Sequence, residues 1–210
     1  MKDLLEKYKG MEFDDDQLYE IEKGIKNNID VSLYADTKFD WAQMREIRKG
    51  LEQNLDVSVY VNSSFSDGQM KRIRYGLDDK VDVSIYAKPE FNTFQMSEIR
   101  QGLVEGLDIS KYADTKFNWE QMFQIRFALR KGIDLTEYVD EKFNANQMTM
   151  ISLGLKEGID ISKYAKIEFS SAQMSKIRYG LLNNLDVSKY ANPSYSEDEM
   201  DEIIKNLENK

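Results

Sequence analysis

Residues 39–61 read FDWAQMREIRKGLEQNLDVSVYV, and closely similar stretches recur every 26 residues along the 210-residue chain. The leading aromatic residue returns at this interval in Phe13, Phe39, Phe65, Phe91, Phe117, Phe143, Phe169 and Tyr195. A tyrosine ladder keeps the same interval through Tyr8, Tyr34, Tyr60, Tyr86, Tyr112, Tyr138, Tyr164 and Tyr190. Such a period is typical of stacked units that bury their apolar faces only against one another. We number the positions of each of the eight repeats from its leading aromatic residue.

Each repeat carries the signals that start and stop a helix. Position 2 is Asp, Asn or Ser in every repeat, and position 5 is Gln in seven repeats and Glu199 in the eighth. This pair forms a capping box, in which two unpaired backbone N–H groups at the helix start are satisfied reciprocally. Position 16 is Asn or Gly in six repeats, and both residues tolerate the left-handed conformation that ends helices. The pattern predicts one main helix of about 13 residues per repeat.

A shorter element follows each main helix. Position 18 is always Asp (Asp30, Asp56, Asp82, Asp108, Asp134, Asp160 and Asp186), and a short segment with the ladder tyrosine comes after it. We interpret this Asp as the cap of a one-turn helix whose tyrosine packs inward. Gly recurs at position 12, inside the main helix, where it costs about 1 kcal/mol relative to Ala. Its recurrence predicts that the backbone of a neighbouring helix approaches closely there.

These elements predict an all-α fold, an α-solenoid of eight helix–turn–short-helix repeats with polar end caps in one continuous domain. Residues 1–12 are interpreted as an N-terminal partial repeat, with Leu5 and Tyr8 in register. Residues 13–194 form seven tandem repeats, and residues 195–210 form a C-terminal capping helix. Because solenoid ends need polar surfaces, the acidic last helix indicates a complete array. Analogy with other αα solenoids suggests a right-handed superhelix.

The composition excludes several function classes. The chain has no His and no Cys, which excludes serine- and cysteine-type triads and typical zinc sites. No apolar run reaches the roughly 20 residues of a membrane span. The net charge of −9 disfavours nucleic acid, although it does not exclude it. We expect a soluble, cytoplasmic protein that needs no cofactor or metal.

The acidic residues do not indicate catalysis or calcium binding. One Asp per repeat gives a row of single carboxylates, whereas calcium needs six to eight oxygens around one point. Adjacent acids such as Asp78 and Asp79 lie in a polar setting that would not raise the pKa of one of them, as a glycosidase requires. We therefore expect a protein that is not an enzyme.

The pattern F-x-x-x-Q-M-x-x-I-R-x-G-L-x-x-x-L-D-V-S-x-Y-A stands at residues 39–61, 91–113 and 169–191 with few departures. It resembles tandem repeats of bacterial proteins, many of which are associated with mobile elements. The resemblance covers nearly the whole chain and implies a helical repeat fold. It implies no catalytic residues, and by analogy it suggests interference with a host defence system.

An arginine ladder occupies position 10, as Arg48, Arg74, Arg100, Arg126 and Arg178. The favoured interpretation is structural: each side chain covers the edge of the core and pairs with an acid of a neighbouring repeat, for example the fixed Asp at position 18. The alternative is a row of guanidinium groups, joined by Arg45 and Arg130, that binds phosphates or acids of a partner.

The clearest binding signal lies at positions 3, 7, 11 and 14, which vary between repeats. In the fifth repeat these positions, together with Arg126, form a strip of residue types enriched at interfaces: Trp119, Phe123, Phe127 and Arg130. Exposed aromatic residues are also expected at Trp41, Tyr75, Phe94 and Tyr179. The strip predicts a surface that binds a protein partner, with a homodimer contact or internal packing as alternatives. Nucleic-acid backbone binding through the arginines, or acidic mimicry of nucleic acid that blocks a defence enzyme, are the alternative functions.

Overall fold

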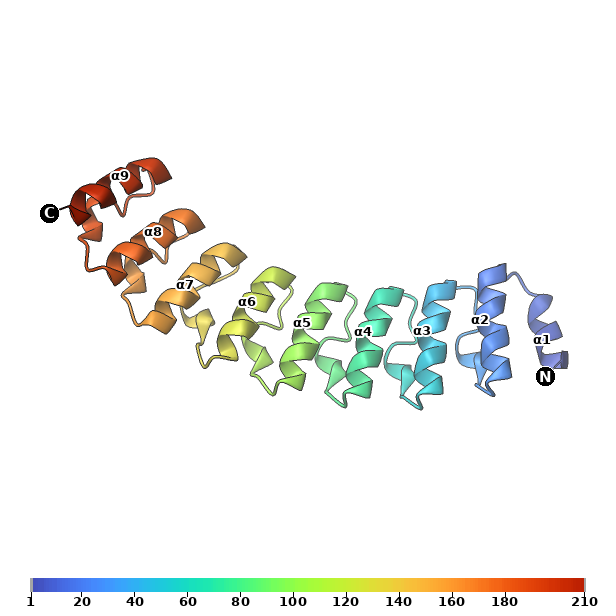
Figure 1. Ribbon diagram of the computed structural model, residues 1–210. Coiled ribbons are helices and arrows are strands. Elements are labelled where there is room, and N and C mark those ends of the chain that lie inside the picture. Colours follow the sequence, from blue (N-terminus) through green and yellow to red (C-terminus); the bar gives the residue numbers. More distant parts are fainter. Residues whose placement is uncertain (1, 210) are drawn as a thin grey trace. The chain divides into compact units, whose positions relative to one another are not determined.

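The computed structural model describes residues 2–209, with the side chains from residue 6 onward, and these residues form helices and turns without a strand (Figure 1). The chain divides into two compact units, Met1–Gly106 and Leu107–Lys210. The first unit holds α1 (Lys2–Lys9), α2 (Asp15–Lys26), η1 (Val31–Leu33), α3 (Trp41–Glu52), η2 (Val57–Val59), α4 (Asp67–Asp78), η3 (Val83–Ile85) and α5 (Thr93–Val104). The second unit holds η4 (Ile109–Lys111), α6 (Trp119–Leu129), η5 (Leu135–Glu137), α7 (Ala145–Glu157), η6 (Ile161–Lys163), α8 (Ser171–Leu182), η7 (Val187–Lys189) and α9 (Glu197–Glu208).

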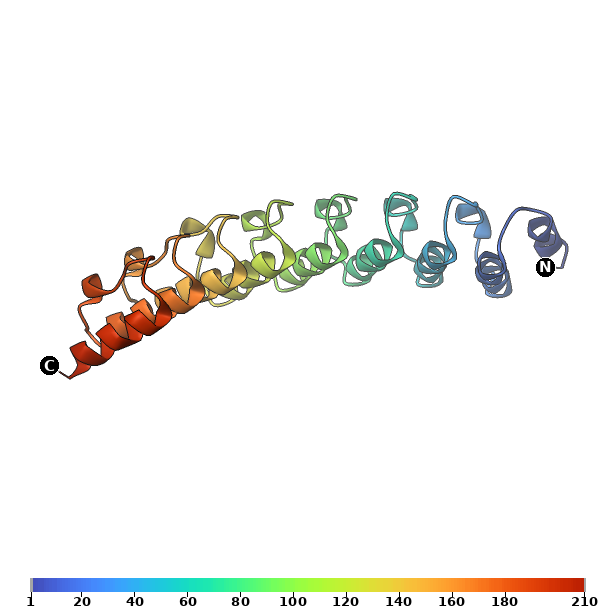
Figure 2. The ribbon, with the colours of Figure 1, turned by 90° about the horizontal axis from the view of Figure 1, so that it is seen from above.

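Within each unit, consecutive main helices pack side by side, which confirms the predicted helical repeat array. The short 3₁₀ turns, labelled η, lie in a second layer on one side of the main helices (Figure 2). The packed array is polar at α9, where Glu197, Asp198, Glu199 and Glu202 are exposed. At the other end Tyr8 is buried as expected, and the side chain of Leu5 lies outside the described residues.

The predicted helix boundaries are confirmed. Each helix from α2 to α9 begins with the capping box formed by positions 2 and 5. Each fixed Asp at position 18 caps a 3₁₀ turn by accepting a hydrogen bond from the backbone N–H two residues later. Position 16 is left-handed in seven repeats, at Asn28, Asn54, Lys80, Gly106, Gly132, Gly158 and Asn184.

Lys80 is the position-16 residue least suited to this conformation, with a φ angle of 60°. A residue with a β-carbon costs roughly 1–2 kcal/mol there, and glycine avoids this cost but loses more entropy on folding. Lys80→Gly is therefore expected to raise the free energy of unfolding by about 0.5–1 kcal/mol. Urea denaturation would measure the gain. The matched variant Lys156→Gly, at an exposed position inside α7, should instead lose about 1 kcal/mol, and a loss in both variants would contradict the assignment.

The Gln that recurs at position 5 has a second structural role besides the capping box. The Gln69 side-chain amide donates a 2.7 Å hydrogen bond to the carbonyl oxygen of Phe91, the leading residue of the next repeat. Its oxygen meanwhile accepts from the backbone N–H of the cap residue Ser66. The same bond across the repeat boundary is made by Gln17, Gln43, Gln121, Gln147 and Gln173. Each of these buried amides thus joins one repeat to the next.

The main helices repeat apolar residues at positions 6, 9 and 13, and positions 6 and 9 are more completely buried than position 13. Met44 and Ile47 are completely buried, whereas Leu51 is half-buried. Ile25 is the buried exception at position 13. The core is completed by the leading aromatic residue, the apolar residue at position 19 and the ladder tyrosine.

The expectation that glycine at position 12 admits a neighbouring helix backbone is wrong. It admits the ladder tyrosine of its own repeat. The Tyr60 hydroxyl passes close to Gly50 and donates a 3.2 Å hydrogen bond to the backbone carbonyl of Glu46. A methyl group at Gly50 would overlap this hydroxyl and lie 2.7 Å from a Val57 methyl group. The same crowding surrounds Gly24, Gly76, Gly154 and Gly180.

The fifth repeat departs from this arrangement, and the expectation that Tyr138 packs inward is wrong. Position 12 is here Ala128, which is fully buried, and Tyr138 is 45% exposed. The alanine methyl group occupies the space that the tyrosine ring needs. Leu135 and Val139 are buried instead, in place of the Val or Ile and the Ala that usually hold positions 19 and 23. The fifth repeat is therefore distinctive in its core as well as on its surface.

The buried tyrosines make stability sensitive to high pH. Burial raises the pKa of Tyr34, Tyr60, Tyr86 and Tyr164, and raises the pKa of Tyr190 to about 12. Unfolded tyrosines ionise near pH 10, so above that pH the unfolded chain releases protons that the folded chain retains. The contribution of these tyrosines to the free energy of unfolding is expected to be constant below pH 10 and to fall above it, by about 1.4 kcal/mol per pH unit for each tyrosine.

Urea denaturation at pH 8, 10 and 11, followed by circular dichroism, would test this dependence. In Tyr60→Phe the free energy of unfolding should fall less steeply above pH 10, because one fewer buried tyrosine contributes to the decline. An unchanged midpoint between pH 8 and pH 11 would contradict the expectation.

Candidate functional site

The main helices present one row of side chains away from the core. At 100° per residue, positions 7 and 11 lie opposite the buried positions 5, 6, 9 and 12. We call these side chains the outer ridge. On α6, α7 and α8 the outer ridge consists of Phe123, Phe127, Thr149, Leu153, Ser175 and Tyr179. None of the six is charged, in a chain of which 32% is charged.

The predicted strip on α6 is exposed, so it does not belong to the packed interior. Trp119, Phe123 and Phe127 are 40%, 37% and 36% exposed. The rings of Phe123 and Phe127 stack with centroids 5.9 Å apart and planes 14° from parallel. Rigid aromatic side chains that are already stacked lose little conformational entropy when a partner covers them.

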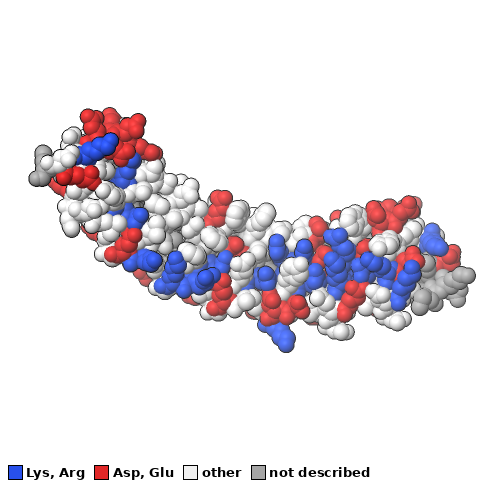
Figure 3. All heavy atoms as spheres, viewed as in Figure 1, with Lys and Arg blue, Asp and Glu red and all other residues white. Residues whose placement is uncertain are grey.

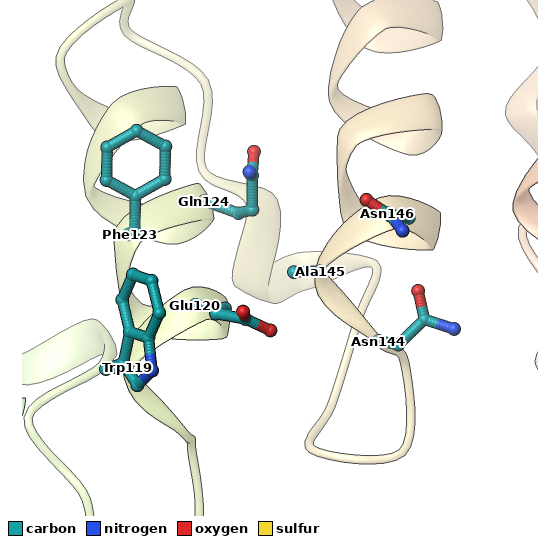
Figure 4. Close-up of a pocket in the computed structure, with 7 residues that line it drawn as sticks. All are labelled: Trp119, Glu120, Phe123, Gln124, Asn144, Ala145 and Asn146. Atoms are coloured by element: carbon teal, nitrogen blue, oxygen red, sulfur yellow. The ribbon is translucent and has the colours of Figure 1, made fainter.

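A shallow groove of about 390 Å³ runs between α6 and α7 beside these rings. One wall consists of Trp119, Glu120, Phe123 and Gln124 of α6, and the other of Asn144, Ala145 and Asn146 at the start of α7 (Figure 4). Ala145 contributes only a methyl group, which leaves the groove open on that side. Neutral amides surround the apolar floor, and Glu120 is the single charged residue of the lining.

Cations border the apolar strip. The Lys131 ammonium lies 3.9 Å from the centroid of the Phe127 ring, and the Arg126 guanidinium lies 5.5 Å from that of Phe123. Arg126 is buried, whereas Arg130, the C-cap of α6, is exposed. An apolar centre with a polar and charged rim is the usual composition of a protein interface.

The other predicted aromatic residues are exposed or half-exposed and belong to other helices. Trp41, Tyr75 and Phe94 belong to α3, α4 and α5 of the first unit. Tyr179 belongs to α8, and α7 lies between it and α6. The Tyr179 hydroxyl donates a 2.6 Å hydrogen bond to the Glu208 carboxylate of α9, which raises the pKa of the tyrosine.

Four of the five ladder arginines pair with acids of the preceding repeat, as the structural interpretation predicted. Arg48 is buried and lies 2.8 Å from the Glu20 carboxylate of the preceding repeat. Arg74 donates in the same way to the buried Glu46, at 2.9 Å. Arg100 and Arg178 are partly exposed and pair with Asp79 and Glu157, which end the preceding helices. Arg45 lies 3.5 Å from Glu46.

The acids that pair with the arginines are not the predicted Asp at position 18, which caps the 3₁₀ turns instead. They stand at positions 8 and 15 of the preceding repeat, and Arg48 also pairs with Glu52 of its own helix. The sequence signal was available: Glu20 and Glu46 at position 8 precede Arg48 and Arg74 by a constant 28 residues. This separation, one repeat plus two residues, places the two groups on facing sides of adjacent helices.

None of the helices in residues 2–209 combines the length and the apolar character that a membrane crossing needs. Among the same residues, no cluster of three or more acidic side chains is arranged to hold a metal ion. Comparisons of the chain with protein-family models, curated proteins and solved structures found no match.

Proposed function

We propose that the chain is a non-enzymatic scaffold that binds a protein partner on the outer ridge of its second unit, centred on α6. The observation that carries the proposal is the stacked, exposed Phe123–Phe127 pair beside the groove that Trp119 lines. Large exposed apolar side chains gathered in one place are uncommon on soluble surfaces that bind nothing. The partner that fits is a protein segment with an apolar or aromatic side chain for the groove and amide or hydroxyl groups for its neutral rim.

The surrounding surface supports a protein partner. Figure 3 shows uncharged atoms over α6 and α7, on a molecule whose surface otherwise carries many charged side chains. Depletion of charge together with enrichment of aromatic residues distinguishes the centre of protein interfaces. Of the nearby cations, Arg178 is paired with Glu157 and Lys131 lies over the Phe127 ring, so both are already engaged and a phosphate backbone is favoured less than a protein segment.

The test is an affinity capture with matched variants, followed by binding measurements on the captured protein. Phe123→Ala and Trp119→Ala should each weaken binding about 30-fold, because interface hot spots contribute about 2 kcal/mol or more. Both side chains are partly exposed, so the melting temperature should change little. The control is Leu33→Ala, which removes an exposed apolar side chain from η1 in the first unit.

The outcomes are distinct. A partner that is retained by wild type and Leu33→Ala but lost by both α6 variants supports the surface. Equal retention by all four proteins contradicts it. Sedimentation of the chain alone separates the homodimer alternative, because a dimer that dissociates on Phe123→Ala would make a second copy the occupant in place of another protein.

A further inference from the structure

The outer ridge of the first unit differs in chemistry from that of the second. On α2, α3 and α4 its members are Tyr19, Lys23, Arg45, Lys49, Lys71 and Tyr75. Every one of these six side chains is either a cation or an aromatic ring. Trp41, the first residue of α3 and position 3 of its repeat, adds a further exposed ring. Figure 3 shows Lys and Arg side chains gathered on this face over α3 and α4.

On each of the three helices an outer-ridge cation lies near an exposed or half-exposed ring, and on α4 the buried Arg74 also lies 4.8 Å from the centroid of Tyr75. The Lys23 ammonium lies 4.8 Å from the centroid of Tyr19, the Arg45 guanidinium 4.9 Å from that of Trp41, and the Lys71 ammonium 5.7 Å from that of Tyr75. A cation held over a ring face is attracted by the ring quadrupole, at exposed sites by about 0.5–1 kcal/mol. The rings therefore restrict the cations to the ridge and reduce the entropy that a ligand must remove when it binds them.

Two carboxylates near the ridge, those of Glu20 and Glu46, are buried beneath it and form ion pairs with arginines. Glu46 is fully buried and accepts from Arg74, while Arg45 and Lys49 lie within 3.5 Å of its other oxygen. Glu20 is buried under the same surface and accepts from Arg48. The ridge cations thus lie at the surface, partly or fully exposed, while the nearest carboxylates, those of Glu20 and Glu46, are covered by protein.

We propose that this basic and aromatic ridge on α2–α4 binds an acidic segment of a partner protein. Charge complementarity selects an anionic ligand, and the rings provide apolar contacts between the cations. Exposed Asp15 and Asp16 in the first turn of α2, and Asp67 in the first turn of α4, lie beside the ridge or close to it. A continuous phosphate backbone would be repelled by the carboxylates of these aspartates. A peptide can place single carboxylates on the cations and keep its other residues away from the aspartates. The proposal does not depend on the α6 surface, because it rests on other residues of the other unit.

The experiment uses the full chain and two labelled probes. One is a fluorescein-labelled 12-residue peptide of alternating Glu and Tyr, and the other is a fluorescein-labelled 20-nucleotide oligo(dT). Fluorescence anisotropy at 50 and 300 mM NaCl should show binding of the peptide that weakens at the higher salt concentration. The charge-reversal variant Lys23→Glu/Lys71→Glu should weaken peptide binding at least tenfold, while Lys156→Glu/Lys166→Glu, which makes the same charge change at exposed positions of the second unit, should not.

Three results would overturn the proposal: no peptide binding at 50 mM NaCl, an equal effect of the two double variants, or tighter binding of oligo(dT) that the first variant abolishes. The last would assign the ridge to single-stranded nucleic acid, which also combines cations with stacking rings. Circular dichroism checks that each variant is folded. Phe123→Ala should leave peptide binding unchanged, which separates this surface from the one on α6.

Discussion

Replacing Gly50 with alanine is expected to lower the free energy of unfolding by about 3–5 kcal/mol, the range found when a large buried aromatic side chain is lost from a core. The added methyl group would overlap the Tyr60 hydroxyl and press on Val57. Tyr60 is completely buried and packed on all sides, so its ring has no small movement available. The ring must leave the core, and its hydrogen bond to the Glu46 carbonyl is lost with it.

The fifth repeat shows the outcome of this substitution. Ala128 stands where the glycine should be, and Tyr138 lies at the surface. There position 19 is also different, since it is Leu135, and both Leu135 and Val139 are buried. Gly50→Ala would displace Tyr60 in a repeat that has Val57 in place of a leucine at position 19, although Val61 already holds position 23 as Val139 does in the fifth repeat. We therefore expect Gly50→Ala to lower the free energy of unfolding by more than the corresponding arrangement does in the fifth repeat.

Urea denaturation of three variants would measure the effect and its cause. Gly50→Ala should lose several kcal/mol, and Gly50→Ala/Tyr60→Phe should recover part of the loss, because the atom in closest conflict is the hydroxyl oxygen. The matched control is Ala128→Gly, which changes the same position where the tyrosine is already outside. It should cost only about 1 kcal/mol, the propensity difference inside a helix. A loss below 1 kcal/mol for Gly50→Ala would contradict the account.

Local features of the repeat could be predicted from the sequence, because caps and turns depend on neighbouring residues. The boxes at positions 2 and 5, the left-handed residue at position 16 and the caps at position 18 all stand where the pattern placed them. For features that depend on how repeats stack, the type of interaction could be predicted but not the residues that make it. Arginine pairing was expected, yet the correct acid for Arg74 is Glu46, 28 residues earlier on a facing helix.

The candidate site shows the same division. Exposure of Phe123 and Phe127 agrees with their angle on the helix, although the sequence pattern left internal packing of the strip as an alternative. Their stacking and the adjacent groove could not be predicted, because both require the distance to α7 and the small side chain of Ala145. Ala128 in place of glycine was a sequence signal for the exposure of Tyr138. It could be interpreted only once the structure showed that the glycine of the other repeats makes room for the tyrosine.

The second large effect is expected for Gln69→Glu, which should lower the free energy of unfolding by about 3 kcal/mol at pH 7. The Gln69 amide donates to the carbonyl oxygens of Phe91 at 2.7 Å and Pro89 at 3.0 Å, in the next repeat. A carboxylate has no hydrogen to donate, so both oxygens would face a negative charge with little access to water. Each buried acceptor left without a donor costs about 1–3 kcal/mol.

The loss should depend on pH with a definite sign. The introduced carboxyl group can donate to the next repeat only when it carries a proton, so folding raises its pKa above the value of about 4.3 for an unfolded Glu. A raised pKa in the folded state contributes stability below the unfolded pKa, and this contribution is lost as pH rises. The difference between the variant and wild type should therefore widen from pH 4 to pH 7.

The chain supplies a matched control in Glu199, which holds position 5 of the eighth repeat. Its carboxylate accepts a 2.7 Å hydrogen bond from the backbone N–H of Ser196, and it is exposed. Glu199→Gln should change the free energy of unfolding by less than about 0.5 kcal/mol. Equal effects of the two variants would show that the bond between repeats contributes nothing. Because both substitutions keep the capping box, any difference between them reports the interaction that joins one repeat to the next.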